Sequence, residues 1–270
     1  SAVRHVTGRA IFIDDIPTLP DALEAVFVIS PYAHAKIVSV DRSKADVTDG
    51  VHEVLIAEDI PGRNDIAPVF DNEPVLATDV VQYVGHPVAI VVGENYDVAF
   101  HAAKEVIVQY EELEPILSIA EALKKEEYTY PPQIIERGDP IGAIKMAAHR
   151  ISGEIFCGGQ DHFYLEGHIA MAQPGEESDM TVYSSTQHPT EVQHGVSNVL
   201  GVPINDVTIE VRRMGGAFGG KESQATIIAA AAALAAAKTN RAVKMRLRRD
   251  DDMVITGKRH DFEFKYDVGV

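Results

Sequence analysis

Short apolar runs separated by turn residues fill the first part of the chain. The runs are rich in Val, Ile and Leu, which favour strands, and Gly, Pro and Asp bound them, which favours turns. This pattern predicts strands at residues 23–29, 36–40, 51–57, 80–84, 88–92 and 107–110. After the fifth run, Asn95 is a typical N-cap for a helix over residues 96–106. Strands mixed with a helix predict a small α+β domain over residues 1–115.

A charged stretch bracketed by prolines follows this domain. We predict that residues 116–149 form a linker with short helices, the first of them over 118–125. A second helix begins after Asp139, its expected cap, and runs to about residue 149. Pro140 suits the first turn of that helix, because the N–H group that proline lacks has no intrahelical partner there.

The remaining segment, residues 150–270, alternates between strand and helix patterns. Strands are predicted at 151–156, 180–184, 207–211, 242–247 and 262–268, and helices at 189–200, 222–238 and 250–254. Within the second helix, about thirteen residues in a row carry no charge, fewer than the roughly twenty that span a bilayer. We therefore predict a buried helix, and a mixed α/β (α+β) fold class for the whole chain.

The chain is long enough for two domains and is strongly acidic. It has 270 residues, of which 46% are hydrophobic, and a formal net charge of −17. This charge disfavours nucleic acid and anionic membrane surfaces as partners, since both attract basic faces. The single cysteine, Cys157, cannot form an internal disulfide or supply an iron–sulfur cluster, so we expect a cytoplasmic protein and a small buried thiol at a strand end.

A glycine-rich loop is the strongest chemical signal in the sequence. Four glycines lie among residues 215–220, between a predicted strand and a predicted helix. Glycine allows positive φ and close approach of a ligand to the main chain, and a following helix favours an oxygen-rich ligand. The loop does not match the nucleotide-binding P-loop, because Glu222 follows Lys221 where that motif has Ser or Thr. From spacing alone, a tight strand-to-helix turn and a ligand-binding loop are equally good interpretations.

A second polar segment, residues 158–166, contains Gln160, His162 and Glu166. It does not have the His-Glu-x-x-His spacing of a zinc site, so we interpret it as a polar loop. We interpret a further set of residues as surface positions: His188, His194 and the solvated charge cluster of Arg246, Arg248, Arg249, Asp250, Asp251 and Asp252.

Taken together and in this order, these two loops resemble the molybdenum hydroxylase family. Residues 158–166 read Gly-Gly-Gln-Asp-His-Phe-Tyr-Leu-Glu, and residues 213–222 read Arg-Met-Gly-Gly-Ala-Phe-Gly-Gly-Lys-Glu. Both are similar to the xanthine dehydrogenase branch, as are residues 5–8, 14–15, 73–77 and 250–260. The resemblance implies an α/β-hammerhead domain over 1–115, followed by the first part of a molybdenum-cofactor-binding domain over 150–270.

The resemblance assigns roles to individual residues. It implies that Gln160 lies beside the cofactor's oxo group, and that the main chain at Phe218 and Gly219 contacts the cofactor. Glu222 matches the carboxylate that holds and polarises a purine, and aldehyde oxidases lack it. We expect no side chain of this chain to ligate the metal directly.

The resemblance also implies the reaction. It is the oxidative hydroxylation of a purine, hypoxanthine or xanthine to urate, with water as the oxygen source. Electrons would leave through 2Fe-2S clusters and FAD, on other domains or chains, to NAD, and we expect an oligomer. The family's general-base glutamate and most cofactor contacts lie beyond Val270, so we expect this chain alone to be inactive and free of the cofactor.

Two alternatives remain at this point. The third residue of the glycine run is Ala217, as in many aldehyde oxidases, which leaves an aldehyde or another N-heterocycle open as the substrate. A positive φ at Ala217 would cost about 1 kcal/mol. The other alternative is a non-catalytic interaction fragment, in which the N-terminal domain serves only as a surface for partner subunits, since no clustered catalytic pair precedes Gly158.

Overall fold

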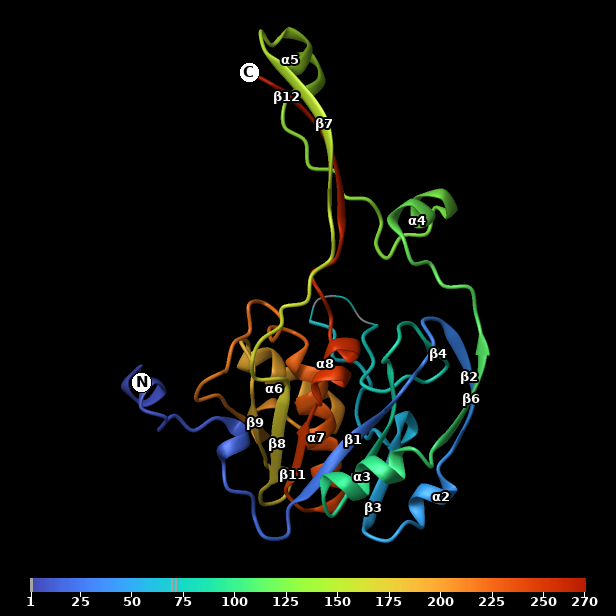
Figure 1. Cartoon of the computed structure of the whole chain (residues 1–270), viewed down its shortest axis with the longest axis vertical. Coiled ribbons are helices and arrows are strands. Elements are labelled where there is room, and N and C mark those ends of the chain that lie inside the picture. The colour runs from blue at the N-terminus through green and yellow to red at the C-terminus, as the bar shows by residue number, and fades with distance from the viewer. Residues whose placement is uncertain (1, 69, 71) are drawn as a thin grey trace. The chain divides into compact units, whose positions relative to one another are not determined.

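The computed structural model describes residues 2–68, 70 and 72–270, and these residues divide into two compact units (Figure 1). The larger unit combines Ser1–Leu113 with His162–Gly257, and the smaller combines Glu114–Asp161 with Lys258–Val270. The mixed α/β fold class predicted from the sequence is confirmed. The units do not follow the predicted division at 1–115, 116–149 and 150–270, because each unit takes residues from both halves of the chain. As a division of the chain into domains, that scheme stays a prediction.

A seven-stranded sheet forms the centre of the larger unit, in the order β10-β9-β8-β11-β1-β5-β3. Its strands are β1 (Leu23–Ile29), β3 (Val51–Ile56), β5 (Pro87–Gly93), β8 (Ile169–Pro174), β9 (Met180–Ser184), β10 (Val207–Glu210) and β11 (Val243–Arg246). At its middle, β1 pairs in parallel with β11, with Leu23 opposite Val243, and antiparallel with β5. Strands from the two ends of the sequence therefore belong to one sheet.

The larger unit also contains a smaller sheet and the helices that position the site. The smaller sheet has the order β4-β2-β6, with β2 (Ala35–Asp41), β4 (Val80–Val81) and β6 (Ile107–Glu112). The α-helices are α1 (Ala2–Val6), α2 (Ser43–Asp46), α3 (Tyr96–Ala103), α6 (Pro189–Leu200), α7 (Ala225–Thr239) and α8 (Arg249–Ile255). Short 3₁₀ turns occur at η1 (Ile13–Asp15), η2 (Ala57–Asp59) and η3 (Ile204–Asp206).

Helix α7 is the centre of the main hydrophobic core. Every residue from Ala225 to Ala236 is buried, so the helix has no solvent-facing stripe. It packs on β8 and β11 of the large sheet and on α6 (Figure 1). Its alanines lack bulk, which lets the helix lie close to its neighbours. The predicted buried helix is confirmed. In a second hydrophobic cluster, α3 packs against β1 and β5 through Ala99 and Ala102.

Several elements differ from the sequence prediction: helices α1 and α2 were not predicted, and β4 is shorter than the predicted strand at 80–84. Strand β8 was not predicted, because Ala and Met are weak strand formers and the run is too short for a clear alternation. Its conformation comes from pairing with β9 on one side and β11 on the other. Helix α7 begins at Ala225, three residues after the predicted start, because residues 221–224 form turns rather than a helical first turn.

The smaller unit contains two short helices and a two-stranded ribbon. Helices α4 (Ile119–Lys125) and α5 (Pro140–Met146) begin where predicted, and the side chains of Ser118 and Asp139 cap them. Strand β7 (Arg150–Cys157) pairs antiparallel with β12 (Phe262–Gly269) along its full length (Figure 1). Cys157 ends β7, as expected, but it is half-buried rather than buried.

Candidate functional site

The glycine-rich loop connects β10 to α7, and its backbone bends sharply at its tip. Gly216, Phe218 and Gly219 have φ of +98°, +56° and +95°. Ala217 is not among the described residues with positive φ, so the alanine at this position carries no such strain. The non-glycine residue with a positive φ in this loop is Phe218. A bulky residue in the left-handed region costs about 1–3 kcal/mol, and such strain is concentrated at functional sites.

The tip of this loop is exposed. The Phe218 side chain is 74% exposed, and Gly219 and Glu222 are exposed as well. The Gly219 N–H donates to the Gln187 Oε1 at 3.0 Å, and the Gly219 carbonyl accepts from the Glu222 N–H at 3.4 Å. Among the residues that the structure describes, none accepts a hydrogen bond from the Phe218 N–H. The N–H groups of Gly216 and Ala217 likewise have no acceptor among the described residues, so the loop presents three consecutive free main-chain donors that end at its strained residue.

A buried ion pair lies beneath the loop. Lys221 is fully buried, and its Nζ lies 3.1 Å from the Glu166 Oε2. Burial lowers the pKa of Lys221, while the Glu166 carboxylate opposes that shift. At the start of the loop, Gly215 lies against Glu166 so closely that a Cβ on Gly215 would be 2.5 Å from the Glu166 Cβ. This pair could not be predicted from the sequence, because the two residues lie 55 positions apart and no motif links them.

A second buried polar group is centred on Asp252. Its Oδ1 accepts hydrogen bonds from the Tyr164 hydroxyl at 2.8 Å and from the His168 Nδ1 at 2.9 Å. Its Oδ2 accepts from the His168 backbone N–H at 2.7 Å. The prediction that Asp252 belongs to a solvated charge cluster is therefore wrong. This carboxylate lies on the inward side of α8, where hydrogen bonds replace its hydration, whereas the neighbouring Asp250 side chain is 85% exposed.

Gln160 belongs to the smaller unit. It forms an isolated antiparallel bridge with Arg259, in which the Gln160 N–H donates to the Arg259 carbonyl at 2.9 Å and the reverse bond is 3.0 Å. The Arg259 guanidinium also donates to the Gly158 carbonyl at 2.6 Å. The main chain of Gln160 is thus fixed, while the residue itself is exposed. Of the four predicted site residues, Phe218, Gly219 and Glu222 lie on one loop of the larger unit, whereas Gln160 lies in the smaller unit.

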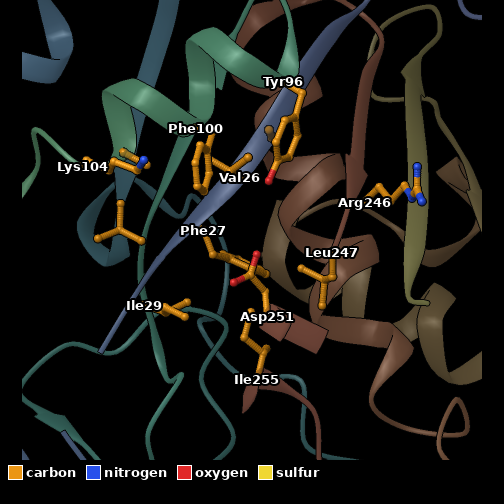
Figure 2. Close-up of a pocket in the computed structure, with 13 residues that line it drawn as sticks. Val26, Phe27, Ile29, Tyr96, Phe100, Lys104, Arg246, Leu247, Asp251 and Ile255 are labelled. Atoms are coloured by element: carbon orange, nitrogen blue, oxygen red, sulfur yellow. The ribbon is translucent and has the colours of Figure 1, made fainter. Parts of the chain in front are cut away.

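A separate cavity of about 200 Å³ lies between β1, α3 and α8 (Figure 2). Tyr96 and Phe100 of α3 line one part of it, and Asp251 and Ile255 of α8 line another. Burial raises the pKa of Asp251, against the opposing charge of Arg248. None of the predicted site residues lines this cavity, so it is not part of the candidate site.

The part of the chain that the structure describes contains neither a side-chain metal cluster nor a membrane-spanning helix. No group of three or more His, Cys, Asp or Glu side chains is placed to hold a metal ion within residues 2–68, 70 and 72–270. Over those same residues, no helix has the length and apolar character needed to cross a membrane.

Two family models cover nearly all of the chain. Residues 7–114 match the aldehyde oxidase and xanthine dehydrogenase a/b hammerhead domain. Residues 125–270, more than half of the chain, match the molybdopterin cofactor-binding domain. The chain belongs to the molybdenum hydroxylase family. The expected order, a hammerhead domain followed by a molybdenum-cofactor-binding domain, is thereby confirmed.

Curated members of the family from two branches match this chain along its full length. Xanthine dehydrogenase/oxidase of Gallus gallus is 42% identical over 270 residues, and that of Mus musculus is 43% identical. Aldehyde oxidase 1 of Oryctolagus cuniculus is 45% identical over 271 residues. The chain spans 20% of the length of each of these relatives. Overall identity therefore does not separate the two branches.

Solved structures of the molybdenum hydroxylase family share this fold. An aldehyde oxidoreductase from Desulfovibrio gigas superposes with a TM-score of 0.86 at 25% identity, covering 100% of this chain and 32% of that one. Quinoline 2-oxidoreductase from Pseudomonas putida 86 superposes with a TM-score of 0.84 at 25% identity, covering 99% and 36%. The names of these proteins indicate different organic substrates on one fold.

The residues of the loop fit the cofactor that the molybdenum hydroxylase family implies. A pterin has hydrogen-bonding edges, and the free N–H of Phe218 is a main-chain donor of the kind that such an edge accepts. A Cβ on Gly219 would meet only the His162 Nε2, at 3.8 Å, so this side of the loop is open to close approach. The donor set is made of main-chain groups and amides rather than metal-ligating side chains.

Proposed function

We propose that this chain is part of a molybdenum hydroxylase that hydroxylates a purine, and that Glu222 binds the substrate. The observation that carries the proposal is the arrangement of the loop. Its strained residue, Phe218, presents a free N–H, and the exposed carboxylate of Glu222 follows four positions later. A carboxylate accepts hydrogen bonds from ring N–H groups, which purines have and simple aldehydes lack.

The bound molybdenum cofactor would supply the oxidising centre and the site at which water-derived oxygen reaches the substrate. Phe218 and Gly219 would hold it through the main chain, and Gln160 through its side-chain amide. Glu222 would accept a hydrogen bond from a purine N–H and so orient the ring beside the cofactor. The main chain at Gly219 and Lys221 is held by hydrogen bonds to the Gln187 side chain, so it would fix the point from which the Glu222 side chain extends.

Replacing Glu222 with glutamine in the complete protein, with its cofactors, tests the purine assignment. We expect kcat/KM for xanthine to fall about a hundredfold, the order of loss that follows when a substrate is no longer held in its reactive orientation. Aldehyde turnover should change little. The matched control is Glu176→Gln, the same change at an exposed position outside the loop. Unchanged xanthine turnover in the Glu222 variant would exclude this residue as the substrate anchor.

The electron path and the partners belong to the same proposal. We propose that 2Fe-2S clusters and FAD lie on other domains or chains, that NAD accepts the electrons, and that the assembly is an oligomeric cytoplasmic enzyme. The isolated 270-residue chain should then contain no molybdenum and should not turn over xanthine. Metal analysis of the purified chain checks this expectation. Stoichiometric molybdenum would overturn it.

An aldehyde is the second candidate substrate. The rabbit aldehyde oxidase matches this chain at 45% identity, slightly above the xanthine dehydrogenases. Ala217 in the glycine run is a further aldehyde-oxidase-like feature. The Glu222 variant separates the two candidates, because aldehyde oxidation does not need an acceptor for a ring N–H. If the wild-type protein and the Glu222→Gln variant oxidise aldehydes at equal rates, and neither oxidises xanthine, this alternative is favoured.

A further inference from the structure

One oxygen atom connects both ends of the glycine-rich loop. The Glu166 Oε2 accepts from the Gly215 N–H at 2.9 Å and from the Lys221 Nζ at 3.1 Å. It also accepts from the Ser185 hydroxyl at 2.5 Å. Gly215 begins the bend and Lys221 ends it, so this atom fixes the distance that the five residues between them must span.

The pair is removed from solvent, so its hydrogen bonds are strong. The Lys221 side chain is 0% exposed and that of Glu166 is 15% exposed. Lys221 Nζ also donates to the Ser185 hydroxyl at 2.8 Å and lies 4.8 Å from the centre of the Tyr164 ring. The ammonium group therefore has a carboxylate, a hydroxyl and an aromatic face around it, and its position is strongly determined.

The main chain of Lys221 is held as firmly as its side chain. Its carbonyl accepts from the Gln187 N–H at 2.8 Å and from the Thr186 hydroxyl at 3.2 Å. Its own N–H donates to the Gln187 Oε1 at 3.3 Å. The next residue, Glu222, is exposed, so its carboxylate projects from a backbone that is fixed one residue earlier.

Stability alone does not account for a charged pair at this position. A buried ion pair is often no more stabilising than a well-packed apolar pair of the same size. An apolar pair, however, has no acceptor for the Gly215 N–H and would leave that buried donor unpaired. A carboxylate serves both requirements, since it receives the main chain at one end of the loop and the lysine at the other.

We infer that Glu166 and Lys221 are positioning residues, which close the loop so that Phe218 and Glu222 stand at the spacing that cofactor and substrate need. This inference rests on the proposed function of the loop. Neither residue touches the substrate. Both act through the main chain of residues 215–222.

The test compares Glu166→Gln and Lys221→Met in the complete protein with its cofactors. The first keeps an acceptor but removes the charge, and the second removes the cation at similar volume. Matched controls are Glu111→Gln and Lys36→Met, which make the same changes in an ion pair whose side chains are 60% and 53% exposed. Hydrogen exchange of peptides covering residues 211–224 should become about tenfold faster in the first two variants, as expected when a hydrogen bond to a charged group is lost. It should stay unchanged in the controls.

A double-mutant cycle with Glu222 distinguishes positioning from general destabilisation. We expect Glu166→Gln to lower kcat/KM for xanthine about tenfold in the wild-type background, and to have no further effect in a Glu222→Gln background, because both changes remove the same contact. Additive losses would mean that Glu166 acts elsewhere and would overturn the inference. So would unchanged hydrogen exchange in the Glu166 and Lys221 variants.

Failure of the proposed function gives a different result. In that case Glu222→Gln has no effect on xanthine turnover, while the exchange measurement still shows whether the pair holds the loop. Should Glu166→Gln not accumulate as folded protein, Ser185→Ala carries the same exchange test. It removes one donor to the same oxygen and leaves both charges in place.

Discussion

Replacing Asp252 with alanine should lower the free energy of unfolding of the chain by about 3–5 kcal/mol, because several buried hydrogen bonds to a carboxylate, each worth about 1.5–3 kcal/mol, are lost together. The Asp252 side chain is 2% exposed. Its loss would remove the acceptor of the buried His168 backbone N–H and of the His168 Nδ1, and one of the partners of the Tyr164 hydroxyl. Urea denaturation followed by circular dichroism measures the change.

The control for this prediction lies on the same helix. Asp250 is two residues earlier in α8, and its side chain is 85% exposed. Asp250→Ala also removes an aspartate carboxylate, but one that faces solvent, and it should change the free energy of unfolding by less than about 0.5 kcal/mol. Equal effects of the two substitutions would show that the Asp252 hydrogen bonds contribute nothing specific.

The Asp252 carboxylate also predicts how stability depends on pH. Burial alone would raise its pKa, but the hydrogen bonds from His168 and Tyr164 outweigh burial and lower the pKa from 3.8 to about 2. A folded-state pKa below the unfolded one stabilises the protein above about pH 4, and this contribution of about 2 kcal/mol is lost as the pH falls towards 2. In Asp252→Asn, that part of the pH dependence should be absent from unfolding curves measured between these pH values.

Replacing Leu234 with alanine should destabilise the chain by about 2–5 kcal/mol, from lost burial and from the cavity left behind. Leu234 is fully buried in α7. The surrounding helix offers mainly alanines, whose short side chains cannot move into the space, so we expect the upper part of this range. The control is Leu165→Ala, at a side chain that is 91% exposed. A similar loss in both variants would contradict the packing described for α7.

Much of the fold could be predicted from the apolar pattern, because burial and pattern agree there. Strand β5 is buried along its whole length, and a continuous apolar run indicated it. Helix α7 was evident from its composition for the same reason. Strand β8 could not be predicted, since its residues adopt the strand conformation through pairing with distant neighbours rather than through local preference.

The candidate site, too, could be predicted from the sequence only in part. Gln160, Phe218, Gly219 and Glu222 came from motifs in the sequence, and the exposed loop residues among them remain proposals for cofactor and substrate binding. The Glu166–Lys221 pair and the Asp252 cluster were missed, because each depends on side chains brought together from separate segments. The run of charged residues around Asp252 suggested a solvated surface. The fold instead buries the Asp252 side chain, which makes it a hydrogen-bond acceptor inside the protein.

The parallel pairing of β1 with β11 has a consequence for how the protein is made. Leu23 needs Val243 as its partner in the sheet, so a nascent chain cannot complete its central sheet until nearly all of this sequence has left the ribosome. Until then, β1 would have an unpaired edge on the side that β11 occupies in the folded chain. The sheet is shared by the two matched family segments, because β1 lies within residues 7–114 and β11 within residues 125–270, so neither segment can complete it alone.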